Sequence, residues 1–326
     1  MTRYPRRRFV TGLASTPLLL RQALGAQPAK KAQIAITYDL EMSRNYPTRK
    51  NIEWDYRKGD LDEATKKYSL EAARIAAKAG VKLHFFLVGR VLEQQDIAWL
   101  EEIHELGHPI GNHTYDHVYL LARTPTETQF RFTRSPWLVK GKTVPQILRE
   151  NIRLTQIAMK QRAGIEQNGF RTPGGFNTGL TERPDIQAML LELGFKWVSS
   201  VYPNHLAKRT EQGVSEEVFD SIVKAQADAQ PFKYESGLIE VPMSPISDVN
   251  AFRSNLWTLD EFVKATSLSI KEVIQNQMTF DFLCHPSCLV IEDPQHVTLK
   301  TMIDLVKSNA DKAAITPIDR IAETVK

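Results

Sequence analysis

The feature that most constrains the fold is a regular alternation of two apolar patterns along the chain. Short runs rich in β-branched and aromatic residues alternate with longer segments in which apolar residues recur with the period of a helix. The predicted strands are residues 33–38, 81–88, 108–112, 169–171, 197–201, 238–241, 279–283 and 313–316. The predicted helices include residues 63–79, 92–106, 145–162, 184–193, 259–275 and 299–308. Strands joined by helical crossovers form parallel sheets, so we predict an α/β fold, a barrel of seven or eight parallel strands.

Two long polar insertions, residues 43–62 and 118–142, interrupt this alternation. Each carries aromatic residues: Tyr46, Trp54 and Tyr56 in the first, and Phe130, Phe132 and Trp137 in the second. Long loops in a compact domain are often functional, and aromatic rings stack on sugars, so we treat the insertions as candidate substrate walls. Ordinary surface loops with partly buried aromatics are the alternative.

The first 26 residues have the layout of an export signal. A basic segment precedes an apolar stretch at residues 9–20, and small residues follow at positions 23, 25 and 26. Residues 6–10, Arg-Arg-Arg-Phe-Val, resemble the twin-arginine signature. We therefore expect export by the twin-arginine machinery to the periplasm or beyond, and a single catalytic domain over residues 27–326. An uncleaved amphipathic N-terminus is the alternative.

The charge balance argues against a nucleic-acid partner. The net charge is +4, but residues 1–26 hold five arginines and no acid, so the remainder has 42 − 5 = 37 bases against 38 acids. No basic stripe interleaved with aromatics remains, and no apolar run after the leader reaches membrane length.

The only cysteines, Cys284 and Cys288, are predicted to be buried thiols because Pro286 lies between them.

Polar side chains lie at the ends of the first and third predicted strands. Asp39 and Glu41 are two apart, so on a strand they point to the same face. His113 and His117 are four apart, which would place both imidazoles on one face of a helical turn, as a divalent metal requires. Taken singly, a solvated strand end and turn-capping histidines are the ordinary alternatives.

Two further strand ends carry polar groups. Residues 169–175, Gly-Phe-Arg-Thr-Pro-Gly-Gly, form a tight turn that exposes backbone N–H groups and leaves Arg171 at a strand end. Residues 282–286, Phe-Leu-Cys-His-Pro, place His285 at another. Active sites of α/β barrels are assembled from the carboxyl ends of several strands, so we predict one site built from all four segments.

These segments resemble the polysaccharide deacetylase family, also called the NodB-homology or carbohydrate esterase family 4 domain. The resemblance rests on residues 34–41, 83–89 and 107–117, the last reading Gly-His-Pro-Ile-Gly-Asn-His-Thr-Tyr-Asp-His, and extends over about residues 31–326. It implies a distorted (β/α) barrel and a hydrolase that removes acetyl groups from an N-acetylated glycan of the chitooligosaccharide or peptidoglycan type.

The resemblance also implies a role for each site residue. Asp39 would be the general base, oriented by Arg171, and His285 the general acid. A divalent metal, expected to be zinc with cobalt, nickel or manganese as alternatives, would be held by Glu41, His113 and His117. The substrate-binding residues would be Pro173, Gly174, Leu283 and Trp197, with Gly174 offering an oxyanion N–H and Leu283 lining the acetyl pocket.

The sequence departs from the family pattern in two places. Asp39-Leu40-Glu41 replaces the usual Asp-Asp, a spacing found in a subset with peptidoglycan deacetylases and allantoinase-like amidohydrolases. The fourth motif usually supplies an Asp that pairs with the acid histidine, but residues 195–200 contain none. Asp281 and Asp248 are both candidates for that place. The departures leave two alternatives: a non-glycan amide hydrolase of the allantoinase or imidase kind, and a degenerate member that only binds glycan.

Overall fold

The structure is a computed structural model that describes residues 31–42 and 58–325. The export signal predicted over residues 1–26 lies outside these ranges, as do Tyr46, Trp54 and Tyr56 of the first insertion. No helix within the described ranges is long and apolar enough to cross a membrane.

The described strands form one curled sheet in the order β6-β7-β5-β4-β3-β2-β1-β8, with β9 also paired to β1. Every pairing is parallel except that of β6 with β7. The strands are β1 (Ala32–Leu40), β2 (His84–Leu87), β3 (Ile110–Asn112), β4 (Phe170–Phe176), β5 (Trp197–Val201), β6 (Phe232–Lys233), β7 (Ile239–Glu240), β8 (Thr279–Cys284) and β9 (Ala313–Ile315). This confirms the distorted barrel and all eight predicted strands; the two-residue β6 was not predicted.

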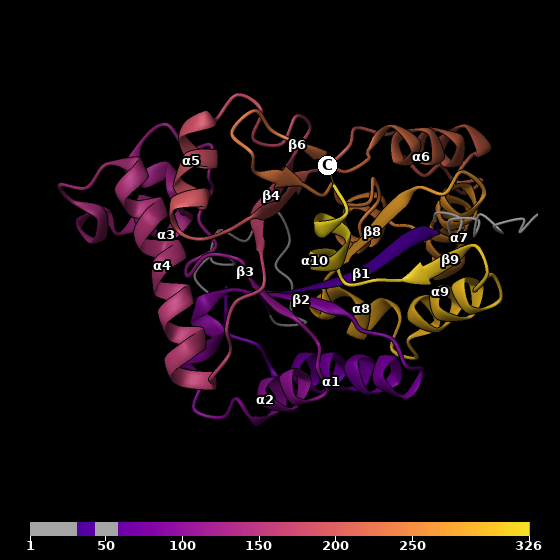
Figure 1. The fold of residues 1–326 in the computed structure, drawn as a ribbon, viewed down its shortest axis with the longest axis horizontal. Coiled ribbons are helices and arrows are strands. Elements are labelled where there is room, and N and C mark those ends of the chain that lie inside the picture. The colour runs from indigo at the N-terminus through magenta and orange to yellow at the C-terminus, as the bar shows by residue number, and fades with distance from the viewer. Residues whose placement is uncertain (1–30, 43–57, 326) are drawn as a thin grey trace, which may run out of the picture.

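The longer helices surround the strands (Figure 1). They are α1 (Glu63–Lys78), α2 (Ala98–Glu105), α4 (Val144–Ala163), α5 (Pro184–Glu192), α6 (Glu216–Asp228), α7 (Leu259–Gln275) and α9 (Val297–Lys307). Shorter helices are α3 (Phe130–Arg134), α8 (Pro286–Glu292) and α10 (Ile318–Glu323). The helix predicted over residues 92–106 begins only at Ala98, because the chain before it forms a separate 3-10 helix, Gly89–Glu93. The Asp96 carboxylate accepts the Ala98 N–H at 2.9 Å.

The alternation of side chains along β1 decides which residues reach the barrel interior. Ile34, Ile36 and Tyr38 are buried in the large cluster that the helices cover. Ala35, two positions before Thr37 and four before Asp39, points the other way and packs in a smaller internal cluster. Thr37 and Asp39 therefore also point into the interior.

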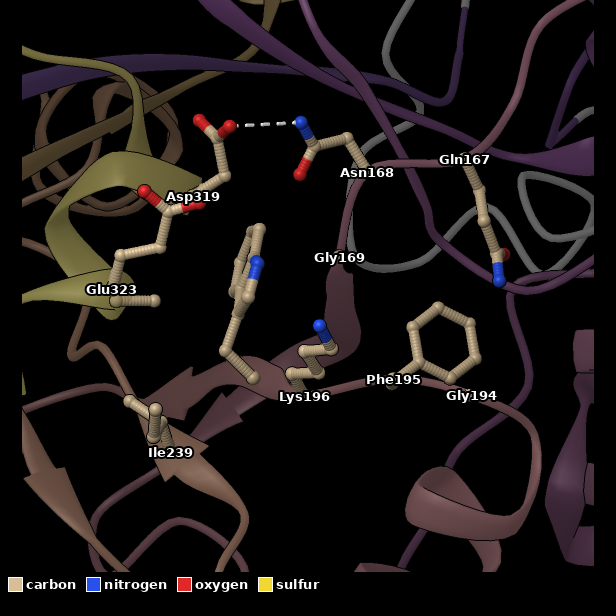
Figure 2. A pocket seen from close by; sticks show the side chains of 11 residues that line it. Gln167, Asn168, Gly169, Gly194, Phe195, Lys196, Ile239, Asp319 and Glu323 are labelled. Atoms are coloured by element: carbon tan, nitrogen blue, oxygen red, sulfur yellow. Dashed lines mark hydrogen bonds between the residues drawn. The ribbon is translucent and has the colours of Figure 1, made fainter.

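The internal cluster closes the amino-terminal end of the barrel. It contains Ala35, Phe86, Trp197, Val241, Ile318, Ile321 and Ala322. The last three belong to α10, which packs against β1. Beside α10 lies a cavity of about 320 Å³, and Figure 2 shows Gly169, Lys196 and Asp319 among its lining residues. The polar residues of the predicted site lie at the other end of the strands.

Gly169 is a position where the packing of this end requires glycine. Its φ is +78°, and a Cβ would lie 1.8 Å from Cζ2 of Trp197. We expect Gly169→Ala to lower the free energy of unfolding by about 3 kcal/mol, combining left-handed strain with overpacking. Gly141→Ala is the matched control, because Gly141 has φ +79° and open space around it. It should cost about 1 kcal/mol. Equal losses in urea unfolding would show that the Trp197 contact contributes nothing.

Candidate active site

A cavity of about 330 Å³ lies at the carboxyl ends of the strands. Most residues predicted to form the site line it: Asp39, Glu41, His113, His117, Gly174, Leu283 and His285. Arg171 is wholly buried directly behind Asp39, and Pro173 lies between two residues that line the cavity, Thr172 and Gly174. Trp197 is not brought to this site. It lines the cavity at the opposite end, because it is the first residue of β5.

The two carboxylates converge on the cavity as the strand pattern predicts. Asp39 lies near the end of β1 and Glu41 directly after it, and both side chains are about 95% buried. His113 Nε2 lies 3.8 Å from Asp39 Oδ2 and 3.4 Å from Glu41 Oε2. His117 Nε2 lies 2.7 Å from the same Glu41 oxygen.

The predicted helical turn under the two histidines is wrong. The segment after β3 is a loop in which Thr114 and His117 both have positive φ, 60° and 59°. Asn112 Oδ1 accepts the Thr114 N–H at 2.9 Å, and Thr114 Oγ1 accepts the Val118 N–H at 3.0 Å. These side-chain bonds replace helical hydrogen bonds, so the imidazoles meet through a tight non-helical turn.

The orientation of His113 leaves one ring nitrogen facing the cavity. His113 Nδ1 donates to the Arg171 carbonyl oxygen at 3.0 Å, which directs Nε2 toward Glu41. A backbone carbonyl bound in this way fixes the tautomer of metal-binding histidines. The ligand atoms of Glu41, His113 and His117 all lie within 4.8 Å of one another. Two imidazole nitrogens and a carboxylate are a donor set of catalytic zinc, so these residues fit a divalent metal.

Arg171 connects Asp39 to a second buried carboxylate. Its Nη1 donates to Asp39 Oδ1 at 3.0 Å and to Thr37 Oγ1 at 2.7 Å, and its Nη2 donates to Asp281. Burial raises the pKa of Asp281, while Arg171 opposes that shift. Asp281 is therefore the partner of Arg171 and not of His285.

Asp248 is the partner of His285. Its two oxygens bind His285 at the ring Nδ1, 2.8 Å away, and at the backbone N–H, 2.7 Å away. His285 Nε2 then lies 4.0 Å from Asp39 Oδ2 and 3.7 Å from Glu41 Oε1. Of the two candidates for the missing fourth-motif Asp, the structure places Asp248 in contact with His285, the predicted acid.

The environment of His285 keeps its ring protonated at neutral pH. Burial alone would lower its pKa, but Asp248, with smaller contributions from Glu41 and Asp39, raises the pKa to about 9. Below about pH 9 the His285 ring is therefore protonated and can donate its proton, whereas above that pH the ring is neutral. This is the protonation state that a general acid requires.

Asp248→Asn is expected to shift the basic limb of the pH–rate profile to lower pH. Without the carboxylate the pKa of His285 falls, so the ring loses its proton earlier as pH rises. The shift should be about one unit or more, the usual effect of a neighbouring opposite charge. The measurement is kcat/KM against pH, with the exposed carboxylate variant Asp260→Asn as control. An unchanged basic limb would contradict the pairing of His285 with Asp248.

The sequence patterns missed Lys58, which follows the first insertion's aromatics. Its side chain is 2% exposed, and its Nζ lies 2.6 Å from Glu41 Oε1. Burial alone would raise the pKa of Glu41, but Lys58 and the two histidines hold it well below its ordinary value. Burial and Lys58 lower the pKa of His117 to about 4. No spacing pattern in the sequence predicts Lys58 as a site residue. In the structure it is recognisable because a lysine is seldom buried.

A polar wall on the far side of the cavity was also missed. The Tyr202 hydroxyl binds the Ser247 hydroxyl at 3.4 Å and accepts from Asn250 Nδ2 at 3.3 Å. All three residues line the cavity. The aromatics of the second insertion do not: Phe132 is buried in a core cluster and Trp137 is 68% exposed.

Comparison with known proteins gives a partial match to one family model and a shared fold. The family model for polysaccharide deacetylases matches residues 60–189. Two structures assigned as polysaccharide deacetylases superpose on the chain. The one from Mycobacterium smegmatis has a TM-score of 0.61 and 16% sequence identity, with 92% of each chain covered. The one from Pseudomonas aeruginosa PAO1 has a TM-score of 0.56 and 12% identity, with 91% of this chain and 92% of the other covered. The structure of PuuE allantoinase superposes at 0.54 and 11%, covering 91% of both. At these identities the structures show a shared fold. No curated protein matches the sequence.

Proposed function

We propose that this protein is an exported, metal-dependent hydrolase that removes acetyl groups from an N-acetylated glycan, a proposal supported by the match of residues 60–189 to the polysaccharide deacetylase model. The observation that carries the proposal is the meeting of a candidate base and a candidate acid at one ligand set. His285 Nε2 lies 4.0 Å from Asp39 Oδ2 and 3.7 Å from Glu41 Oε1. His113 Nε2 lies 3.8 Å from the same Asp39 oxygen.

Each residue has a task that its contacts favour. A divalent metal held by Glu41, His113 and His117 would supply polarisation of the scissile carbonyl and a lowered pKa of an attacking water. Asp39 accepts the proton of that water, and Arg171 holds the Asp39 carboxylate in place. His285 donates its proton to the departing amine as the carbon–nitrogen bond breaks. Acetate and a free amino sugar are the products.

The Gly174 backbone and Leu283 complete the binding side of this proposal. Gly174 has φ +76° and borders the cavity, and its carbonyl accepts the Thr172 hydroxyl at 2.7 Å, which fixes the turn. Its N–H is the candidate donor to the tetrahedral oxyanion. Leu283 contributes an apolar side chain to the cavity that His285 also lines, and it is the candidate contact for the acetyl group. We further propose zinc as the metal and, from the leader, the periplasm or the cell exterior as the location, reached through the twin-arginine machinery.

The test is acetate release by the chain lacking residues 1–26, supplemented with zinc. The substrates are chitooligosaccharides, peptidoglycan and acetylated xylan, each with and without a chelator. Acetate that disappears with the chelator is the expected result and identifies the substrate class. Acetate release that survives complete metal removal would contradict metal dependence.

A non-glycan amide hydrolase is the second candidate, favoured by the Asp39-x-Glu41 spacing. The shared fold with PuuE allantoinase and a cavity of about 330 Å³, within the size range of small-molecule sites, are compatible with it. Turnover of cyclic ureides or imides, with none of acetylated sugars, would establish this candidate instead. A glycan-binding protein without catalysis would require an incomplete site, whereas the residues proposed as base, acid and ligand set all line one cavity.

A further inference from the structure

Lys58 places a cation at the candidate ligand set. Its Nζ lies 2.6 Å from Glu41 Oε1 and 3.4 Å from His117 Nε2, so it contacts two of the three candidate ligands. The residue is 1% exposed and lines the cavity. A buried ammonium is costly unless it is paired, and the Glu41 carboxylate supplies a negative charge beside it.

The backbone holds Lys58 at this position. The N–H of Gly59 donates to the Glu41 carbonyl at 2.7 Å, which joins residues 58–59 to the end of β1. Gly59 has φ +88°, and a Cβ there would lie 2.4 Å from Cβ of Arg90, so the chain turns in a space that admits only glycine. The Lys58 side chain therefore starts from a fixed point next to Glu41.

Ammonium and metal would compete for the same carboxylate. Glu41 Oε1 accepts from Lys58, while Oε2 faces His117 at 2.7 Å and His113 at 3.4 Å. A dication within bonding distance of these three residues would lie a few ångströms from Nζ. Like charges at that distance repel strongly in a buried site, so one must give way or bind weakly.

We propose that Lys58 is an internal cation that competes with the divalent metal for Glu41 and so weakens metal binding. The proposal rests on the metal centre of the proposed function. The Lys58 ammonium would leave Glu41 when a divalent metal binds there, and would pair with Glu41 again when the metal is removed. Lys58 thus sets the metal concentration at which the site fills.

The first test is metal affinity in Lys58→Met, which keeps the length of the side chain and removes its charge. Zn²⁺ binding is measured by competition with a chromophoric chelator, and Co²⁺ binding by its visible absorption. We expect both ions to bind at least about tenfold tighter than in the wild type, the scale of one strong charge contact near a metal ligand. Lys67→Met is the control, because Lys67 is 76% exposed and pairs only loosely, at 3.8 Å, with Glu71.

Equal or weaker affinity in a folded Lys58→Met protein would overturn the proposal. If acetate release stays chelator-sensitive in that case, the proposed function stands while the competition fails. If neither the wild type nor Lys58→Met binds metal, and the chelator does not change acetate release, the proposed metal centre is contradicted.

A second test uses the wild-type chain and does not depend on the variant folding. Lysine acylation followed by peptide mass spectrometry reports the exposure of each ammonium. Labelling of Lys58 should rise when Zn²⁺ is added, while labelling of Lys67 stays constant. Labelling of Lys58 that is unchanged at saturating Zn²⁺ would show that the ammonium does not leave Glu41.

Discussion

Asp39→Asn is expected to lower kcat for acetate release by about a thousandfold, the middle of the range for losing a general base. Asparagine has nearly the same shape and can still accept from Arg171 through its amide oxygen, so the fold should persist. It cannot take a proton from water, which is the step assigned to Asp39. The measurement is kcat at saturating substrate together with the bound metal per chain.

The bound metal per chain distinguishes the loss of the general base from a general disruption of the site. Because Glu41, His113 and His117 remain, Asp39→Asn should bind metal with nearly wild-type stoichiometry. Asp185→Asn, which alters a surface carboxylate paired with Arg183, is the control for loss of one negative charge. A variant that keeps wild-type kcat would remove Asp39 from the mechanism.

His113→Ala is expected to abolish metal binding and acetate release together. It removes one of the three proposed ligands, and with it the hydrogen bond to the Arg171 carbonyl. Loss of a ligand should weaken metal affinity by more than about a hundredfold, since disturbing an outer contact alone costs ten- to a hundredfold. Affinity is measured by chelator competition and activity by acetate release at saturating glycan.

The control for this prediction is His104→Ala, an exposed histidine on α2. It should leave both readouts at wild-type values. Circular dichroism establishes that the His113 variant is folded. Full activity in a folded His113→Ala protein would contradict the site assignment, and full activity with lost metal would contradict metal dependence alone.

The sequence by itself determined the strands and the direction of their side chains. Apolar periodicity is a local property, so all eight predicted strands are present, and residues 197–201 and 259–275 match β5 and α7 residue for residue. The period of two along β1 also places Asp39 and Glu41 together. Since parallel strands end at one edge, the residues at four strand ends could be assigned to one site. Cys284 and Cys288 are buried free thiols, as predicted.

Only the tertiary structure decided which charges pair. Asp248 lies 37 residues from His285 in the sequence, and Asp281 lies 110 residues from Arg171. Nothing in the sequence distinguishes the two aspartates as partners, because only the packing of the chain brings each one beside its cation. The turn at His113 depends on side-chain hydrogen bonds that override the four-residue spacing. Trp197 begins its strand and so lies at the closed end of the barrel, away from the site. Lys58 reaches Glu41 because the backbone at Gly59 returns to β1, a long-range contact that no periodicity records.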